Sequence, residues 1–402
     1  MTATDPSLPA DEQLRKRLVE LTRNLILIPS TADRPDEIDR CMEFVINHVE
    51  NAGAVTVHRY REGNAPACVL LPRAIAAPKV LLLAHLDIVS LPDSTPYRSI
   101  VRDERIYGPG AGDMKGELAI LLEVFRAIHE RCPGMSVGLA VTSDEERGGA
   151  HGTRFLFEDA GLRCGAAIVP DSGAVNEIAV EEKGALHLRI RVEGKAGHGS
   201  RPWLADNPLD RIVTAQNKIR ACFDTLKSGR DHWHPTCTFT LIHTSNQVAN
   251  RIADSAEVVC DIRFPFPFTV EQMLSAVRDC LDENMRLEPS VAAEPTVLDP
   301  DPLYLAVTEE LTGKPVNLIR EHGGSDARFI AKYGIPVIMT RPLVGNLHTY
   351  DEWIDIPTME ILIPDLRDLP VKKTGHELRS FPESPAPADP RHTAFRRGQT
   401  SG

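Results

Sequence analysis

The stretch VLLLAHLD, residues 80–87, begins as a continuous apolar run and ends in polar residues. A short apolar run without alternation is typical of a strand that is buried on both faces of a sheet. In an open parallel sheet, ligands bind beyond the carboxyl ends of the strands. Because His85 and Asp87 follow the run, the sequence predicts two polar side chains at such an edge.

Two later stretches, residues 137–141 and 166–169, are apolar runs of the same kind. An amphipathic helix is predicted between the first two strands, where apolar residues recur at helical spacing. These residues are Leu118, Leu121, Leu122 and Phe125. The order strand, helix, strand predicts an α/β domain with a mostly parallel sheet.

The pattern changes at about residue 182, where apolar and polar residues begin to alternate. Such alternation is typical of a strand that is buried on one face only. A helix near residues 209–226, strands at 236–243 and 256–264, and a helix at 270–281 are predicted to follow. This order indicates an inserted α+β domain of the ferredoxin-like kind.

The predicted domain boundaries follow from this change of pattern. The first domain is expected to comprise residues 11–181 and 296–368, interrupted by an insert at residues 182–295. The ends, residues 1–10 and 369–402, are expected to be flexible, since the C-terminal segment is too rich in proline to pack.

Composition excludes several classes of partner. The 402-residue chain carries a formal net charge of −12, which disfavours nucleic acid and anionic membranes. No apolar run approaches the ~20 residues of a membrane span, and the first residues lack the features of a signal peptide. The eight cysteines form no C-x-x-C pair. We interpret them as reduced core residues, which favours a cytoplasmic location.

Possible metal ligands follow the predicted strands and stand in one late loop. They are His85, Asp113 in GDMKG, Glu145 and Glu146 in SDEE, Asp171, and His348 in GNLH. Each motif alone has an ordinary alternative, because H-x-D occurs by chance and D-E-E is usually a solvated loop. Their joint placement favours a metal site, since two histidines and three carboxylates suffice for two metals that share one carboxylate.

Together these motifs resemble the metallopeptidase family of acetylornithine deacetylase, succinyl-diaminopimelate desuccinylase and glutamate carboxypeptidase. The similarity extends over residues 14–357, with five separated motifs in the order of the family. The resemblance implies a zinc-peptidase catalytic domain and an inserted lid domain that also forms a homodimer.

The resemblance assigns the metal ligands residue by residue. It implies that His85 and Asp171 hold one metal, that Glu146 and His348 hold the other, and that Asp113 bridges the two. Two zinc ions per subunit are expected, with cobalt or manganese as alternatives.

Two further roles at the metals are implied by the same resemblance. Asp87 matches the residue that hydrogen-bonds the imidazole of the first ligand and so fixes its tautomer. Glu145 matches the general base, which takes a proton from the attacking water and passes it to the leaving amine.

His198, in the AGHGSRP stretch at residues 196–202, matches a histidine that reaches a neighbouring active site. In dimeric relatives this residue crosses between subunits and helps to stabilise the oxyanion. Without the resemblance, a surface histidine in a glycine-rich turn would be the simpler interpretation.

Recognition of a substrate carboxylate is implied for Asn250 and Arg263, because an arginine fork binds a carboxylate with two parallel hydrogen bonds. Lys183 is a weaker candidate for the same role. Simpler alternatives remain, since Arg263 could pair with Asp261 or Glu257 and Lys183 could be solvated. A glycine-rich stretch resembles the substrate loop of the family, with Gly323, Gly324 and Ser325.

The chain departs from the family pattern at three places. Pro109 stands in a Gly-x-Gly where Arg is common, Glu117 stands where a second Gly is common, and Ser90 stands where Pro is common. None of these changes removes a ligand or the base, so they bear on the substrate more than on the chemistry. One aminoacylase branch of the family has a Cys at the bridging position. This chain has Asp113 there, so we do not place it in that branch.

The expected function is hydrolysis of an amide bond in an N-acyl amino acid or small peptide that bears a free carboxylate. A dipeptidase or an N-carbamoyl-amino-acid amidohydrolase is the alternative within the superfamily. An inactive binding or scaffold homologue is the alternative of another class, but such proteins usually lose a ligand or the base.

Overall fold

The computed structural model describes residues 10–92 and 97–362, which form two compact units. Within these residues, the first unit comprises residues 10–179, 299–318 and 329–362, and the second comprises the remainder. The sequence assigned residues 319–328 to the first domain, whereas the structure places them in the second unit. The predictions for residues 1–9 and 369–402 lie outside the described residues.

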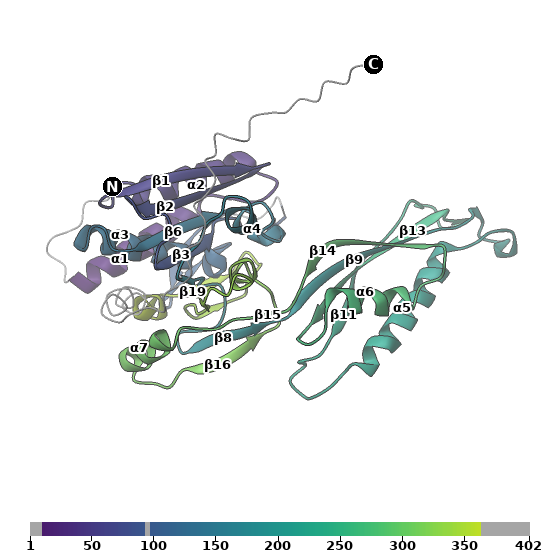
Figure 1. Ribbon diagram of the computed structural model, residues 1–402. Coiled ribbons are helices and arrows are strands. Elements are labelled where there is room, and N and C mark those ends of the chain that lie inside the picture. The colour runs from purple at the N-terminus through teal and green to yellow at the C-terminus, as the bar shows by residue number, and fades with distance from the viewer. Residues whose placement is uncertain (1–9, 93–96, 363–402) are drawn as a thin grey trace, which may run out of the picture. The chain divides into compact units, whose positions relative to one another are not determined.

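A six-stranded sheet forms the centre of the first unit (Figure 1). β6, β3, β7 and β17 run parallel to one another, and the hairpin of β1 and β2 adds to β6 in antiparallel orientation. In spatial order the strands are β1 (Val55–Glu62), β2 (Ala65–Pro72), β6 (Val137–Thr142), β3 (Val80–His85), β7 (Ala166–Ile168) and β17 (Val337–Ile338). The sheet is mostly parallel, and every residue of β3 and β6 is buried.

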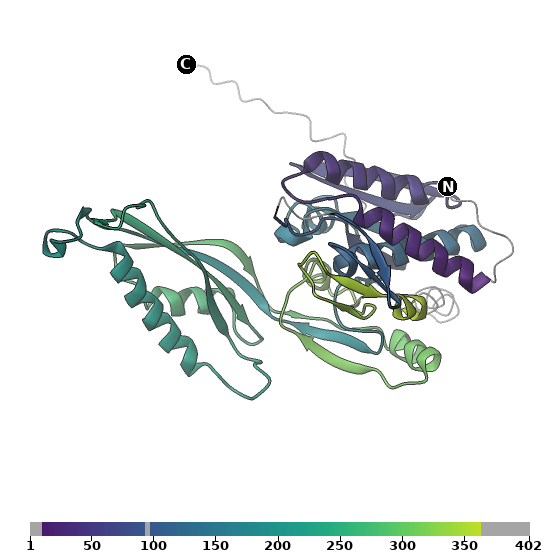
Figure 2. The same ribbon diagram turned by 180° about the vertical axis from the view of Figure 1, so that it is seen from behind.

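Three helices build much of the core of the first unit. α1 (Ala10–Ile26) and α2 (Pro35–Val49) pack on α3 (Gly116–Arg131), which contacts β3 and β6. Figure 2 shows α1 and α2, in purple, on the side of the sheet toward the viewer. The four apolar residues that predicted α3, from Leu118 to Phe125, are fully buried. The shorter helices of this unit are α4 (Thr153–Glu158) and α7 (Pro302–Thr312).

A small antiparallel sheet brings the late part of the chain beside residues 100–107. Its strands, in spatial order, are β18 (Val344–Gly345), β19 (Trp353–Asp355), β5 (Arg105–Tyr107) and β4 (Ile100–Arg102). Strands of two or three residues carry no readable periodicity, so the sequence did not predict this sheet.

The second unit is an antiparallel sheet with two helices. Its strands, in spatial order, are β11 (Thr236–Thr244), β13 (Ser255–Phe264), β9 (Gly184–Glu193) and β14 (Met285–Ala293). α5 (Pro208–Thr225) and α6 (Val270–Arg278) share a core with the alternating apolar residues of β9. The sequence missed β14, which contains Pro289 beside a register shift, as an edge strand tolerates.

A three-stranded sheet contains two of the points at which the chain passes between the units, at residues 179–180 and 318–319. It consists of β15 (Thr296–Val297), β8 (Glu177–Glu182) and β16 (Asn317–Glu321). Among the residues that the structure covers, no helix is long and apolar enough to span a bilayer.

Candidate metal centre

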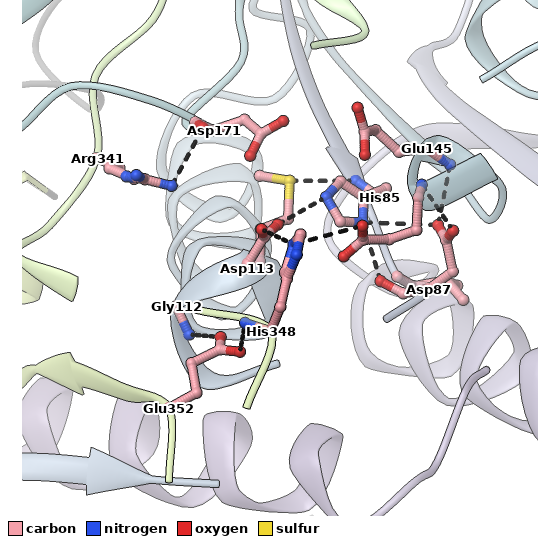
Figure 3. Close-up of polar contacts among 12 residues, drawn as sticks. His85, Asp87, Gly112, Asp113, Glu145, Asp171, Arg341, His348 and Glu352 are labelled. Atoms are coloured by element: carbon pink, nitrogen blue, oxygen red, sulfur yellow. Dashed lines mark hydrogen bonds and ion pairs between the residues drawn. The ribbon is translucent and has the colours of Figure 1, made fainter. Parts of the chain in front are cut away.

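The carboxyl ends of three parallel strands supply one half of the centre. His85 is the last residue of β3, and Asp171 follows β7 closely. Glu145 and Glu146 begin a short 3-10 turn, Glu145–Arg147, just after β6. Because β6, β3 and β7 are adjacent in the sheet, these side chains lie at one edge (Figure 3).

Two connecting segments supply the other half. Asp113 lies in η1 (Ala111–Lys115), a single turn that leads into α3. The buried ammonium of Lys115 anchors this turn to the end of α1, donating to the carbonyls of Leu25 at 2.8 Å and Ile28 at 2.5 Å. His348 comes from the loop between β18 and β19 and has a left-handed backbone with φ of 62°.

The side chains form two groups whose potential ligand atoms lie within 4.8 Å of one another. The first group is His85, Glu145 and Asp171, and the second is Asp113, Glu146 and His348. All five predicted metal ligands and the predicted base therefore come together in the first unit.

Asp113 lies between the two imidazoles. Its Oδ1 is 3.3 Å from His85 Nε2, and its Oδ2 is 3.1 Å from His348 Nε2. Glu146 Oε2 is 3.5 Å from the same atom of His348. One carboxylate thus faces both groups, as a bridging ligand would.

Asp87 contacts both His85 and the turn that contains Glu145 and Glu146. His85 Nδ1 is 3.0 Å from the backbone oxygen of Asp87 and 3.5 Å from its Oδ1. The carboxylate itself accepts the N–H groups of Glu145 at 3.2 Å and Glu146 at 3.1 Å. The family resemblance implied only the imidazole contact, but the Asp87 carboxylate also holds the turn that carries both glutamates.

Burial and neighbouring charges displace the pKa of several groups. Burial and the Asp113 carboxylate raise the pKa of Glu146 to about 8. Its hydrogen bond with Asp113 raises the pKa of His348 to about 9. Burial opposes protonation of His85, but Asp113 and Asp87 raise its pKa well above the usual value. Burial likewise opposes ionisation of Asp113, but the two imidazoles hold its pKa below the ordinary range.

The chemistry of the cluster fits a divalent metal. Glu146 Oε1 is buried and has no hydrogen-bond partner within the described part of the chain, and buried His85 Nε2 has only the ion-pair contact with Asp113 at 3.3 Å. Such atoms are unfavourable unless another group satisfies them. Imidazoles and carboxylates without a thiolate are common ligands of divalent metals.

Glu352 is a buried residue beside this centre that the sequence did not predict. Its Oε1 accepts the N–H of Gly112 at 2.7 Å, and its Oε2 accepts that of His348 at 3.2 Å (Figure 3). Burial raises its pKa to about 7. An acidic residue four positions after a ligand histidine was the only signal in the sequence.

A pocket is lined by the second group and by several apolar residues. Its charged or titratable lining residues are Asp113, Glu146, His348 and Glu352. The apolar residues are Ile88, Val89, Leu91 and Pro109. Pro109, where the family commonly has Arg, is therefore a lining residue of this pocket.

The predicted residues for oxyanion and carboxylate binding belong to the second unit. His198 is exposed, and its Nδ1 accepts the N–H of Ser200 at 3.1 Å. The carbonyl of Asn250 accepts the N–H of Gly199 at 2.7 Å, which ties the two predicted segments together.

Arg263 and Lys183 both have partners in the second unit. Arg263 donates from Nε and Nη2 to Asp261 at 2.7 and 3.1 Å, the pairing that the sequence left open. The buried Lys183 ammonium donates to the carbonyls of His232 at 2.8 Å and His234 at 2.9 Å, so it is not solvated. In the predicted substrate loop, Gly323 and Gly324 are exposed and Ser325 is buried.

Comparison with known proteins gives a family. The chain matches the model of peptidase family M20/M25/M40 over residues 81–367. Succinyl-diaminopimelate desuccinylase of Bordetella petrii is 30% identical over 370 residues, which cover 86% of this chain and 94% of the relative. The protein of the same name from Bordetella pertussis is 29% identical over 369 residues, with 85% and 94% covered.

Solved structures share the fold. An M20 family metallo-carboxypeptidase from Sulfolobus solfataricus aligns with a TM-score of 0.72 at 15% identity, covering 90% of this chain and 99% of that chain. Human carnosine dipeptidase 1 aligns with a TM-score of 0.71 at 13% identity, covering 91% and 100%. The family model matches more than half of the chain and spans all of the proposed metal ligands and the proposed base. The chain therefore belongs to peptidase family M20/M25/M40 and is a metal-dependent hydrolase of amide bonds.

Proposed function

We propose that this protein is a two-zinc amidohydrolase that cleaves an N-acyl amino acid or small peptide next to a free carboxylate. The observation that carries the proposal is the pair of ligand groups that face a single carboxylate, Asp113. His85 and Asp171 would hold one metal, and Glu146 and His348 the other. The absence of a thiolate from this set favours zinc, and cobalt or manganese could replace it.

Bound metals would lower the pKa of the attacking water and polarise the scissile carbonyl. Glu145 takes the proton from this water and delivers it to the leaving amine. Its position supports the role, since it lies within the first ligand group while its backbone is held by Asp87. A base must be fixed within hydrogen-bond reach of the proton that it removes.

Substrate orientation is assigned to residues of the second unit. Arg263 would bind the free carboxylate with Asn250, and Lys183 and the 323–325 loop would add to the site. The bond to Asp261 uses only two donors of the Arg263 guanidinium, which has five N–H groups in all. His198 would stabilise the oxyanion in the active site of a neighbouring subunit.

A homodimer through the second unit completes the proposal. β11 is an edge strand of its sheet, and Leu241 and Ile242 on it are 52% and 54% exposed. Exposed edges of this kind are pairing surfaces unless they are blocked. We place the enzyme in the cytoplasm, where its eight cysteines would stay reduced.

The proposed substrate class includes the kinds of substrate that are named for the relatives and the similar solved structures. Desuccinylation, dipeptide hydrolysis and carboxypeptidase action all cleave an amide beside a carboxylate. A dipeptidase or carbamoyl-amino-acid amidohydrolase differs in the acyl group and not in the metal site, so only a substrate panel separates them. The inactive-scaffold alternative is disfavoured because all ligands and Glu145 are present.

The test is amine release from a panel of N-acyl amino acids, N-carbamoyl amino acids and dipeptides. Zinc- or cobalt-loaded protein should turn over one group of these substrates. Glu145→Ala should bind both metals yet lose at least 100-fold in kcat, since general acid–base catalysis contributes roughly 10²–10⁴-fold. Near-normal turnover in this variant would exclude Glu145 as the base, and no turnover by the wild type would favour the scaffold alternative.

A further inference from the structure

Glu352 is a buried carboxylate whose two oxygens contact two segments that are far apart in the sequence. Its side chain is 1% exposed, and it immediately precedes β19. One oxygen accepts the N–H of Gly112, the residue before Asp113, at 2.7 Å. The other accepts the N–H of His348 at 3.2 Å. A single side chain therefore connects the backbones that carry two proposed ligands.

The hydrogen bond from His348 to Glu352 holds a proposed ligand whose side chain has little packing around it. The His348 side chain is 53% exposed, in contrast to the 2% of His85. Its φ of 62° is in the left-handed region, which a non-glycine residue adopts only when its surroundings stabilise it. The hydrogen bond from its N–H to Glu352 supplies such a stabilising contact at the ligand itself.

The contact with Gly112 lies where two elements approach closely. A Cβ atom on Gly112 would be 2.6 Å from Val344 Cβ and 3.1 Å from the carbonyl oxygen of Trp353. There is no space for a side chain between η1 and the β18–β19 hairpin. Burying a carboxylate here is unfavourable unless both oxygens are hydrogen-bonded, and the two N–H groups meet that need.

We propose that Glu352 is a positioning residue that sets the second metal site by fixing the backbone of His348 relative to Asp113. The inference rests on the proposed two-metal function. The first site has separate supports, because His85 is at the end of a buried strand and the carbonyl of Asp171 accepts a hydrogen bond from Arg341 at 3.2 Å. Loss of Glu352 should therefore weaken one metal and spare the other.

Glu352→Gln is the direct test, since the amide retains the shape of the side chain. Its oxygen can accept one N–H, but its NH₂ group opposes the other. Zinc titration of the metal-free protein by calorimetry should give two equivalents in the wild type. In the variant, one equivalent should keep its affinity and the second should weaken 10- to 100-fold, the usual cost of losing a residue that orients a ligand. The cobalt absorption spectrum should lose the contribution of the second ion.

Glu123→Gln is the matched control, because Glu123 is also a buried carboxyl of the first unit and its partners Arg17, Arg126 and His48 are not proposed ligands. This variant should bind two equivalents with wild-type affinity. Two wild-type equivalents in Glu352→Gln, or equal weakening of both, would overturn the inference while leaving the proposed function intact. A wild type that binds fewer than two metals would overturn the two-metal function and this inference with it.

Hydrogen exchange on the wild-type protein gives a test that needs no variant. The amides of Gly112 and His348 should both be protected, with or without metal, because Glu352 holds them in each case. Rapid exchange at His348 in the zinc-loaded protein would contradict the proposed contact, even if Glu352→Gln failed to fold.

Discussion

Asp87 and Glu352 illustrate how single carboxylates organise this centre. Each is buried, and each uses its oxygens to accept backbone N–H groups of residues that carry or adjoin ligands. The two residues thus fix ligand-bearing loops that secondary structure alone would leave mobile.

Sequence patterns predicted these residues unequally. His85 and Asp87 follow an apolar run directly, so local order alone placed them at a strand end. His348 was found through the resemblance, since the two-residue strand β18 before it has no readable pattern. Glu352 was missed because its contact with Gly112 spans 240 residues and depends on the folded chain.

Arg263→Ala tests the proposed carboxylate site. We expect KM to rise and kcat/KM to fall by 10- to 100-fold with both metals retained, since a charge-assisted hydrogen bond contributes roughly 1.5–3 kcal/mol. Steady-state kinetics and zinc content measure this. Arg189→Ala is the control, because Arg189 lies on the same sheet and pairs with Glu257 at 3.3 Å on the exposed face. Unchanged KM and kcat/KM in Arg263→Ala would refute the assignment.

At the scale of elements, α3 connects the core to the centre. It begins directly after η1, which contains Asp113, and it packs on α1 and α2. The periodicity of its apolar residues predicted it, whereas β14 escaped prediction because Pro289 interrupts its pattern. Long periodic elements could be predicted from the sequence, and short strands held by tertiary contacts could not.

The three helices also meet at Glu123, a buried carboxylate of α3. It accepts hydrogen bonds from Arg17 of α1 at 3.0 Å and from Arg126 at 2.7 Å, and its other oxygen lies 3.0 Å from His48 Nε2 of α2. Burial opposes ionisation, but these three partners lower the pKa of Glu123 to about 2. A carboxyl whose pKa falls on folding stabilises the fold above its unfolded pKa of roughly 4.3 and loses that effect as the pH falls toward 2.

Glu123→Gln should therefore lower the free energy of unfolding at pH 7 by on the order of 2–3 kcal/mol. The difference in the free energy of unfolding between wild type and variant should become smaller as the pH falls from 4 to 2. Urea unfolding of both proteins in metal-free form measures this without interference from the metal site. Glu43→Gln removes an exposed pair with Arg59 and should cost less than about 1 kcal/mol. If the difference in the free energy of unfolding between wild type and Glu123→Gln did not change with pH, ionisation of Glu123 would contribute nothing to the stability of the fold.

At the scale of the whole molecule, the metal centre and the predicted substrate residues belong to different units. The proposed metal ligands all lie in the first unit, while His198, Asn250 and Arg263 lie in the second. The sequence predicted a division of this kind from the change of strand pattern near residue 182. The sequence could not assign residues 319–328 to the second unit. Their position depends on β16, which pairs with β8, a strand far away in the sequence.

The proposed homodimer predicts that a charge on the edge strand β11 separates the two subunits. Leu241 and Ile242 are exposed on the edge strand β11, where an isologous contact would bury them against a second copy. Sedimentation velocity should show a dimer for the wild type and a monomer for Ile242→Lys, since a buried unpaired charge is strongly unfavourable. The monomer should keep its metals but lose kcat, because His198 would no longer reach a neighbouring site.

Val297→Lys is the control for this change, since Val297 is 63% exposed in the same unit but lies on β15, outside that sheet. It should remain dimeric and active. A dimeric Ile242→Lys would exclude β11 as the interface. A monomeric wild type with full activity would exclude the role of His198 across subunits, while leaving the assignment of the metal ligands to be judged by zinc content alone.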